Sequence, residues 1–459
     1  MTTHVFSKNP QETYPIKTKY RSILTPIPAP GTEAVLGDLE RYESRSMHGQ
    51  LPIVWDRAID FSVYDIAGNK WIDFTSTIFT ANIGHANPRL VREIKRVLDQ
   101  GLVHTYAYPH KIRAEYLKKL VAFAGPVFEK AFLVSSGTEA VEAALKLMRL
   151  HGLKREKRRL GIVCVEGNWH GRTMGAQFMH SDPEQKKWVG HDDPDIHHIP
   201  FPYPWAVDDQ SPVAFLWNAL RWLEAKGVDL KRDVCGFMLE TFQGWGAVFY
   251  PGEFVQAVEE ICRKYDILLA FDEMQAGFAR TGKRFGYEHY EVRADLIACG
   301  KGMGSGYPLS GVLGGAEIMD LPEVGNMSST HSASPMACAA GMATLEEIEC
   351  GHLVEEAARK GRLLHDKLND LKEKHGNRIS FVLGQGLIAA VLFHKPGGTE
   401  PDSKFPSRVS ELCMRKGLLV VHTGRESIKI GPPLTIPDDA LMEGVEVLDE
   451  AISELNERK

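Results

Sequence analysis

Between about residues 131 and 315, short apolar runs alternate with longer stretches of helical pattern, and this alternation constrains the fold more than any other feature. The runs span residues 131–134, 161–165, 236–239, 267–271, 296–298 and 311–313. Apolar runs of this length, bounded by glycine or polar residues, are typical of strands buried on both faces. Strands alternating with helices predict an α/β fold with a large, mostly parallel sheet flanked by helices.

The remainder of the chain predicts a second, smaller α+β domain. Helical patterns cover residues 88–100, 335–350, 352–375 and 408–416, with a last helix from 438, and apolar strand patterns cover 379–383 and 387–393. We therefore expect a large domain at residues 71–340 and a small domain at 341–459. Residues 1–70 form an N-terminal segment that we expect to pack with the small domain.

Composition excludes several classes of protein. The chain has 459 residues, and its formal net charge of −6 gives no electrostatic footprint for nucleic acid. The sequence contains no run of 18 apolar residues, the length that predicts a membrane-spanning helix. The first 20 residues lack the apolar core of a secretory signal. The 7 cysteines form no C-x-x-C pair, which favours a reducing compartment. We expect a cytoplasmic protein with neither a nucleic-acid nor a membrane partner.

In a parallel sheet, ligands bind beyond the carboxyl ends of the strands, so the residue after each apolar run is a candidate for chemistry. Ser136, Gly137 and Thr138 follow the first run and open a helix. Unpaired N–H groups at a helix N-terminus favour an anion, which predicts a phosphate site. An ordinary helix cap explains the same residues equally well.

Three further residues stand at strand ends. Trp169 follows the second run and offers a ring plane for stacking, although core aromatics are common. Asp272 follows five apolar residues, and a carboxylate so placed needs a cationic partner or several donors. A protonated ring nitrogen, a bound metal or a buried Arg would serve, and a structural ion pair is the alternative without function. Lys301 lies in a glycine-rich loop after the run 296–298. A lysine beside a carbonyl cofactor in a partly dry loop forms a Schiff base, whereas a solvated lysine is the commoner alternative.

Two nucleotide motifs and one metal site are rejected. The loop around Lys301 lacks the Gly-x-x-x-x-Gly-Lys-Ser/Thr spacing of a P-loop, and its glycines do not match the dinucleotide fingerprint. His191, His197 and His198 lie among aspartates without metal-ligand spacing. We interpret them as a polar loop, and we expect no metal.

An anion site, a stacking ring, a buried carboxylate and a loop lysine together match the needs of pyridoxal 5'-phosphate. At these residues the sequence resembles the class III (omega) aminotransferases, which are pyridoxal-phosphate enzymes of fold type I. The matching strings are SGTEA at 136–140, WHG at 169–171, FDEMQAGFARTG at 271–282, GKGMGSGYP at 300–308, Thr330 with SPMAC at 334–338, and PPLTI at 432–436. The resemblance implies that fold type, with a seven-stranded large sheet.

The resemblance also implies roles. Lys301 would form the Schiff base and carry the proton, and Asp272 would pair with the ring nitrogen. Trp169 would stack on the ring, where the family usually has Tyr or Phe. Gln275 would face the phenolic oxygen of the ring, and Glu240 would support the region of Asp272.

The phosphate would be held by the helix start at Ser136, Gly137 and Thr138. Thr330 would reach the phosphate of a neighbouring subunit, since these enzymes place the cofactor at a dimer interface. A homodimer, or a dimer of dimers, is therefore expected.

Two departures from the family concern the substrate. Many members carry a Glu where this chain has Trp245, and an Arg where it has Lys429. The Glu–Arg pair of those members opens to hold a substrate carboxylate. A lysine cannot make the two-pronged contact of an arginine, and Arg425 lies close by in sequence as a substitute. The expected substrate therefore differs in shape from 4-aminobutyrate, for example an amino sugar or a larger amino acid.

The predicted function is transfer of an amino group from a primary amine or amino acid to a 2-oxo acid or other carbonyl acceptor, with ping-pong kinetics. An amino-acid racemase, epimerase or aminomutase on the same scaffold shares the early chemistry and stays open. A non-catalytic protein of this fold is a third possibility, against which the presence of Lys301 argues.

Overall fold

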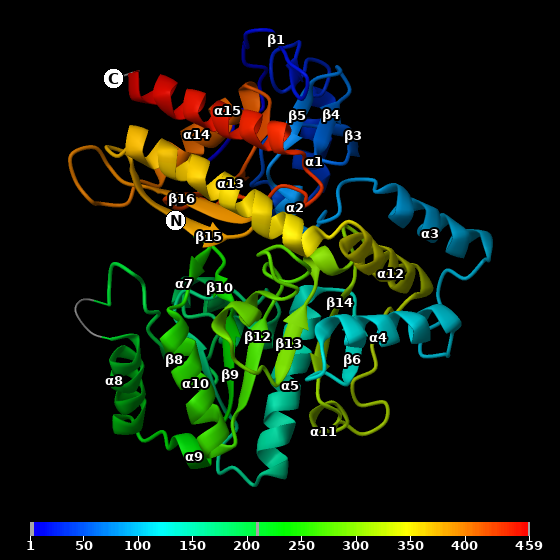
Figure 1. Ribbon diagram of the computed structural model, residues 1–459, viewed down its shortest axis with the longest axis vertical. Helices are drawn as coiled ribbons and strands as arrows, with labels where there is room; N and C mark the ends of the chain where they lie inside the picture. Colours follow the sequence, from blue (N-terminus) through cyan, green and yellow to red (C-terminus); the bar gives the residue numbers. More distant parts are fainter. Residues whose placement is uncertain (1–3, 208–210, 458–459) are drawn as a thin grey trace. The chain divides into compact units, whose positions relative to one another are not determined.

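The computed structural model describes residues 4–207 and 211–457 (Figure 1). Within these residues the chain forms two compact units. The first contains residues up to 87, the short segment 245–247 and residues from 355 onward, and the second contains residues 88–244 and 248–354. Both ends of the chain thus contribute to one unit, and the middle of the chain forms the other.

The second unit is built on a seven-stranded sheet in the order β6-β14-β13-β12-β9-β7-β8. The strands are β6 (Lys130–Val134), β14 (Ser310–Gly314), β13 (Leu296–Cys299), β12 (Leu268–Asp272), β9 (Val234–Glu240), β7 (Gly161–Val165) and β8 (Ile196–Ile199). Neighbouring strands are parallel except that β14 is antiparallel to both β13 and β6. The predicted α/β class and the six predicted strands of this sheet are confirmed.

One prediction about this sheet is wrong. His197 and His198 do not lie in a polar loop, because they are the two central residues of edge strand β8, which pairs in parallel with β7. The strand was missed because its two flanking isoleucines enclose only histidines, so no apolar run marks it. His191 lies outside β8, in the segment that leads into it.

Helices cover the sheet of the second unit, and the longest of them packs an apolar face against the strands. In α5 (Gly137–Lys154), Val141, Leu145 and Met148 recur at helical spacing and are buried against strand residues such as Ile162 and Met238. The other helices of this unit are α3 (Pro88–Asp99), α4 (Lys111–Ala124), α6 (Met174–Phe178), α7 (Pro183–Lys186), α8 (Pro212–Ala225), α9 (Leu230–Asp233), α10 (Gly252–Tyr265), α11 (Ala316–Met319) and α12 (Pro335–Cys350). A two-stranded ribbon joins β10 (Phe242–Gln243) to β11 (Val248–Phe249).

The first unit contains two small sheets. One has the order β1-β2-β5-β4-β3, with β17 (Leu418–Leu419) added in parallel to β5 (Lys70–Asp73). Its other strands are β1 (Ile16–Lys17), β2 (Ser22–Ile23), β4 (Ser62–Asp65) and β3 (Trp55–Ile59). The second sheet is β15 (Ile379–Gln385), β16 (Ile388–Phe393), β19 (Ser427–Ile430) and β18 (Val421–His422). The helices are α1 (Glu33–Tyr42), α2 (Ser76–Phe79), α13 (Leu353–Lys374), which begins two residues before this unit, α14 (Lys404–Arg415) and α15 (Asp438–Glu457).

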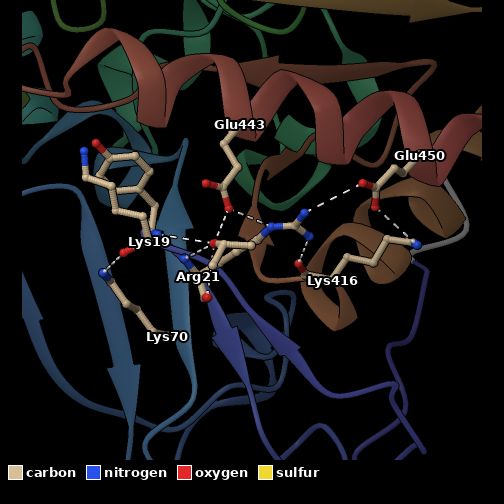
Figure 2. A network of polar contacts seen from close by, with 8 residues as sticks. Lys19, Arg21, Lys70, Lys416, Glu443 and Glu450 are labelled. Carbon is tan, nitrogen blue, oxygen red and sulfur yellow. Dashed lines mark hydrogen bonds and ion pairs between the residues drawn. The ribbon is translucent and has the colours of Figure 1, made fainter.

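A network of polar contacts ties the two ends of the chain together inside the first unit (Figure 2). The guanidinium of Arg21 donates from Nε to Glu443 at 2.9 Å and from Nη1 to the carbonyl of Lys416 at 2.8 Å. Its Nη2 lies 3.7 Å from Glu450. Only 10% of the Arg21 side chain is exposed, so these contacts satisfy a largely buried cation.

Candidate active site

A cavity of about 280 Å³ lies at the edge of the large sheet where its parallel strands end. The strands β7, β9, β12 and β13 run in the same direction, so the residues that follow them meet at this edge. The lining residues come from these strand ends and from the start of α5. They are Gly137, Thr138, Trp169, His170, Gly171, Glu240, Thr241, Phe242, Asp272, Met274, Gln275, Ala276 and Lys301.

The backbone of Lys301 has a conformation that residues other than glycine rarely adopt. Its φ is +45°, in the left-handed region, which costs a non-glycine residue about 1–2 kcal/mol. Such strain persists where the surrounding structure requires it, and it clusters at functional sites. Burial lowers the pKa of the Lys301 ammonium, and the charges of Asp272 and Glu240 oppose this shift. Lys301 thus shares the lining of one cavity with two carboxylates, those of Asp272 and Glu240.

Asp272 ends β12 and has two partners in the described structure. Its Oδ1 accepts the N–H of Met274 at 3.0 Å, and its Oδ2 lies 2.9 Å from His170 Nδ1. Because a carboxylate accepts hydrogen bonds, Nδ1 of His170 carries the proton. Only 5% of Asp272 and 3% of His170 are exposed. The imidazole therefore orients the carboxylate toward the cavity.

The start of α5 has its own polar arrangement. Glu139 Oε2 accepts the N–H of Ser136 at 2.8 Å and the Ser136 hydroxyl at 2.9 Å. The N–H groups of the next residues, Gly137 and Thr138, belong to the first helical turn, where a helix offers them no internal acceptor. Gly137 and Thr138 line the cavity, so this helix start is placed to offer N–H donors to an anion there, whereas Ser136 does not line the cavity.

A second loop packs against this helix start. The Thr138 hydroxyl lies 2.6 Å from that of Thr173, which in turn donates to Glu142 Oε1 at 2.6 Å. A Cβ at Gly171 would lie 2.3 Å from Thr138 Oγ1, so only glycine allows this approach. The loop of residues 171–173 thus restricts the position of the Thr138 side chain.

Trp169 and Glu240, which also line the cavity, are joined by a hydrogen bond. The N–H of Trp169 donates to Glu240 Oε2 at 2.9 Å. A Cβ at Gly244 would lie 2.2 Å from Gln275 Nε2 and 2.9 Å from Glu240 Oε1, so the three residues are packed closely. The structure therefore brings together, in the lining of one cavity, Gly137, Thr138, Trp169, Glu240, Asp272, Gln275 and Lys301.

The structure does not bring Thr330 to this cavity. The residue is exposed, and its carbonyl accepts a hydrogen bond from His104 Nε2 at 2.8 Å.

The three candidate substrate residues lie in the first unit. The Arg425 guanidinium carbon is 3.8 Å from the centre of the Trp245 ring, a cation–π contact. The Ser427 hydroxyl donates to the Trp245 carbonyl at 2.8 Å. Lys429 is buried, with its Nζ 4.6 Å from the Phe79 ring.

Sequence reasoning missed His170, Gly171 and Glu142. His170 could have been found, because it stands beyond β7 as Asp272 stands at the end of β12, and both strands flank β9 in one parallel sheet. Glu142 had no such signal, since it lies one turn inside α5. Among residues 4–207 and 211–457, no group of three or more His, Cys, Asp or Glu side chains is placed to hold a metal ion. In the same residues, no helix is long and apolar enough to cross a membrane.

Comparison with known proteins identifies the family. The model of the aminotransferase class-III family matches residues 44–452. A 4-aminobutyrate aminotransferase of Mycobacterium tuberculosis is 32% identical over 451 residues, which cover 95% of this chain and 98% of that protein. An acetylornithine aminotransferase of Caldanaerobacter subterraneus is 30% identical over 412 residues, or 89% and 96% of the two chains. The solved ornithine aminotransferase of Toxoplasma gondii superposes with a TM-score of 0.82 at 25% identity, covering 94% of this chain and 97% of its own.

The chain therefore belongs to the class-III aminotransferases, with the fold type I architecture of its structural neighbours. It is an enzyme of pyridoxal-phosphate-dependent transamination. The relatives named above are all aminotransferases, and none of them favours the racemase, epimerase or aminomutase alternative.

The cavity fits this cofactor by its own chemistry. Two glycines leave space that a Cβ would fill, since one at Gly137 would lie 2.8 Å from Met274 Sδ and one at Gly171 would meet Thr138. The α5 N-terminus offers N–H donors to a phosphate. Asp272 offers a negative charge to a protonated ring nitrogen, and Lys301 offers an amine to an aldehyde.

Proposed function

We propose that this cavity is the transamination site, that Lys301 is the attachment point of the cofactor, and that Lys301 also moves the proton. The supporting observation is the placement of the Lys301 amine among the carboxylates of Asp272 and Glu240 at the strand edge. Bound pyridoxal phosphate supplies an electron-withdrawing ring that acidifies the C–H bond beside the amine nitrogen.

Different residues around the cavity hold different parts of the cofactor. The N–H groups of Gly137 and Thr138 bind the phosphate, with Ser136 at the helix cap. Asp272 keeps a proton on the ring nitrogen, because its negative charge favours the cationic form. Trp169 covers one face of the ring, Gln275 contacts the phenolic oxygen, and Glu240 holds the Trp169 backbone.

Lys301 is suited to proton transfer because its pKa is lowered. A larger fraction of its amine is unprotonated at neutral pH than for a solvated lysine, so Nζ can accept a proton from the substrate carbon. Nζ would then deliver this proton to the cofactor carbon that is bound to the amine nitrogen. Two half-reactions that share one site give ping-pong kinetics.

The amine donor is an amino acid with a terminal amino group, and the acceptor is a 2-oxo acid. The relatives named above act on 4-aminobutyrate and acetylornithine, both of which carry a carboxylate. Arg425, stacked on Trp245, supplies a guanidinium for that carboxylate, with buried Lys429 as a second cation. Arg425→Met should raise KM for amino-acid donors while leaving KM for benzylamine unchanged. Equal increases for both donors would contradict this assignment.

The enzyme acts as a homodimer, or a dimer of dimers, in the cytoplasm. The exposed Thr330 and the apolar stripe Val35, Leu39 and Tyr42 on α1, which has no buried residue, support the dimer. The seven cysteines are all free, which supports a reducing compartment. Light scattering of the purified protein should give twice or four times the chain mass, and cell fractionation tests the compartment.

The decisive experiment maps the covalent link. Holoenzyme reduced with borohydride and digested should carry the cofactor on the peptide that contains Lys301. Lys301→Ala should carry no adduct and lose transamination by several orders of magnitude, because both the attachment point and the base are removed. An adduct on another lysine, or none in the wild type, would overturn the proposal.

A further inference from the structure

We propose that His180, a buried residue behind the cavity wall, is a positioning residue that fixes Trp169 and His170 in the orientation the cofactor requires. The inference rests on the proposed roles of Trp169 and Asp272 and goes beyond them. His180 does not line the cavity, so it acts through its two neighbours and does not touch the cofactor.

One contact of His180 fixes the backbone of His170. His180 is 1% exposed and lies just after α6. Its Nε2 accepts the N–H of His170 at 3.1 Å. Because this nitrogen accepts, the proton of the neutral ring resides on Nδ1. The same His170 donates from its own Nδ1 to Asp272, so one hydrogen bond connects His180 to the residue that positions the carboxylate.

A second contact fixes the ring of Trp169. The rings of His180 and Trp169 have centroids 4.7 Å apart at an interplanar angle of 40°. The Trp169 backbone is already held by Glu240, and the Arg172 guanidinium carbon lies 4.5 Å from the centre of the indole ring. The His180 ring adds a further contact that limits rotation of the indole. Trp169 and His170 are consecutive in sequence. A single imidazole therefore controls both the stacking surface and the support of Asp272.

The environment keeps His180 in the form that can accept a hydrogen bond. Burial, together with the nearby His170, Arg172 and His198, lowers the pKa of His180 to about 3 against the opposing charge of Asp182. Burial likewise lowers the pKa of His198 to about 4. His180 thus stays neutral throughout the physiological range, and a protonated ring would lose the acceptor and place a second cation beside Arg172.

Three substitutions separate the two contacts. His180→Phe keeps an aromatic ring and removes the acceptor, His180→Gln places an amide oxygen near the position of Nε2 and removes the ring, and His180→Leu removes both. His151→Phe is the matched control, because His151 is also a buried histidine of this unit and lies near the other end of α5, away from the cavity. For each purified protein, the dissociation constant of pyridoxal phosphate, the visible circular dichroism of the bound cofactor and the melting temperature of the apoprotein are measured.

We expect His180→Leu to bind the cofactor about tenfold more weakly and to change the visible dichroism, because the orphaned N–H of His170 and the loosened indole displace the site. His180→Phe and His180→Gln should each recover part of the affinity, and His151→Phe should lower only the melting temperature. The proposal is overturned if His180→Leu binds and absorbs like the wild type, or if both single-contact variants are as weak as His180→Leu. It is also overturned if His151→Phe weakens binding equally. Failure of the wild type to bind the cofactor at all would instead refute the proposed function.

Discussion

At the scale of single residues, position 171 tolerates only glycine. Its φ of +137° is one that L side chains rarely adopt, and a Cβ would lie 2.3 Å from the Thr138 hydroxyl. Gly171→Ala should weaken pyridoxal phosphate binding by about tenfold, because Thr138 must move from the helix start that holds the phosphate. Equilibrium dialysis of the purified enzyme measures the effect.

Gly190→Ala is the control for Gly171→Ala. Gly190 also has a positive φ, +79°, but nothing lies within 4 Å of its Cβ position. It should cost about 1 kcal/mol of stability through backbone strain and leave cofactor affinity unchanged. If the two alanine variants bound the cofactor equally well, Thr138 would have no part in phosphate binding.

The buried carboxyl group of Glu273, the neighbour of Asp272, should make the stability of the protein depend on pH. Burial raises the pKa of Glu273 from 4.5 to about 7, although Thr241 and the N–H groups of Gly286 and Tyr287 donate to it. The folded protein thus binds more protons than the unfolded chain between these two values, so stability falls as pH rises through this window. Relative to Glu273→Gln, the wild type should lose unfolding free energy from pH 4.5 to 7 and change little above. A parallel pair of stability curves in urea titrations would contradict this.

At the scale of elements, Glu142 links α5 to α6. Its Oε1 accepts from the Thr173 hydroxyl and from the N–H groups of Gly175 at 2.8 Å and Ala176 at 3.2 Å, which lie in the first turn of α6. Glu142→Ala should cost about 1–3 kcal/mol and release Thr173 from Thr138. Glu142→Gln, which keeps the oxygen and loses the charge, should cost less. Chemical denaturation ranks the two variants, with exposed Glu224→Ala on α8 as the control, and equal stability of all three would exclude the link.

The sequence predicts the elements of the sheet interior better than those of its edge. Strands such as β7 and β12 are buried along their whole length, so the apolar run and the strand coincide within one or two residues. Edge strand β8 has histidines at its centre and gives no run. The antiparallel direction of β14 was also hidden, because an apolar run carries no information about direction. The first residue of β14, Ser310, lies beside Gly300, which directly follows β13. Strand β14 therefore begins at the edge of the sheet where β13 ends.

The residues of the site that follow strand ends were predictable from the sequence, because one rule about parallel sheets applies to all of them. Chemistry at the carboxyl ends of parallel strands pointed to Trp169, Asp272 and Lys301, and all three line one cavity. Their supporting contacts were not predictable. The bond between His170 and Asp272 joins residues 102 positions apart, and no local periodicity encodes such a pairing.

At the scale of the whole molecule, stability of the first unit depends on the contact between its N-terminal and C-terminal segments (Figure 2). Arg21→Met should lower the unfolding free energy of this unit by about 1–3 kcal/mol, because it leaves the largely buried Glu443 carboxylate with less compensation. Lys19→Met is the control, since the Lys19 and Asp439 side chains are 72% and 60% exposed and exposed ion pairs contribute little to stability. Limited proteolysis near residue 21 should quicken only in Arg21→Met. Equal cleavage of both variants would show that the network contributes no more than a surface pair.

The pairing of β5 with β17 has a consequence for biosynthesis. Residues 70–73 leave the ribosome more than 300 residues before their partner strand, Leu418–Leu419, is made. The central segment from 88 to 354 contains every strand of the large sheet and can fold while translation continues. The first 87 residues cannot complete their fold until the C-terminal segment has been synthesised. Until then their strand edges and apolar side chains such as Trp71 stay exposed. Nascent chains of this enzyme are therefore most exposed to aggregation, and most in need of a chaperone, in the interval between the two events.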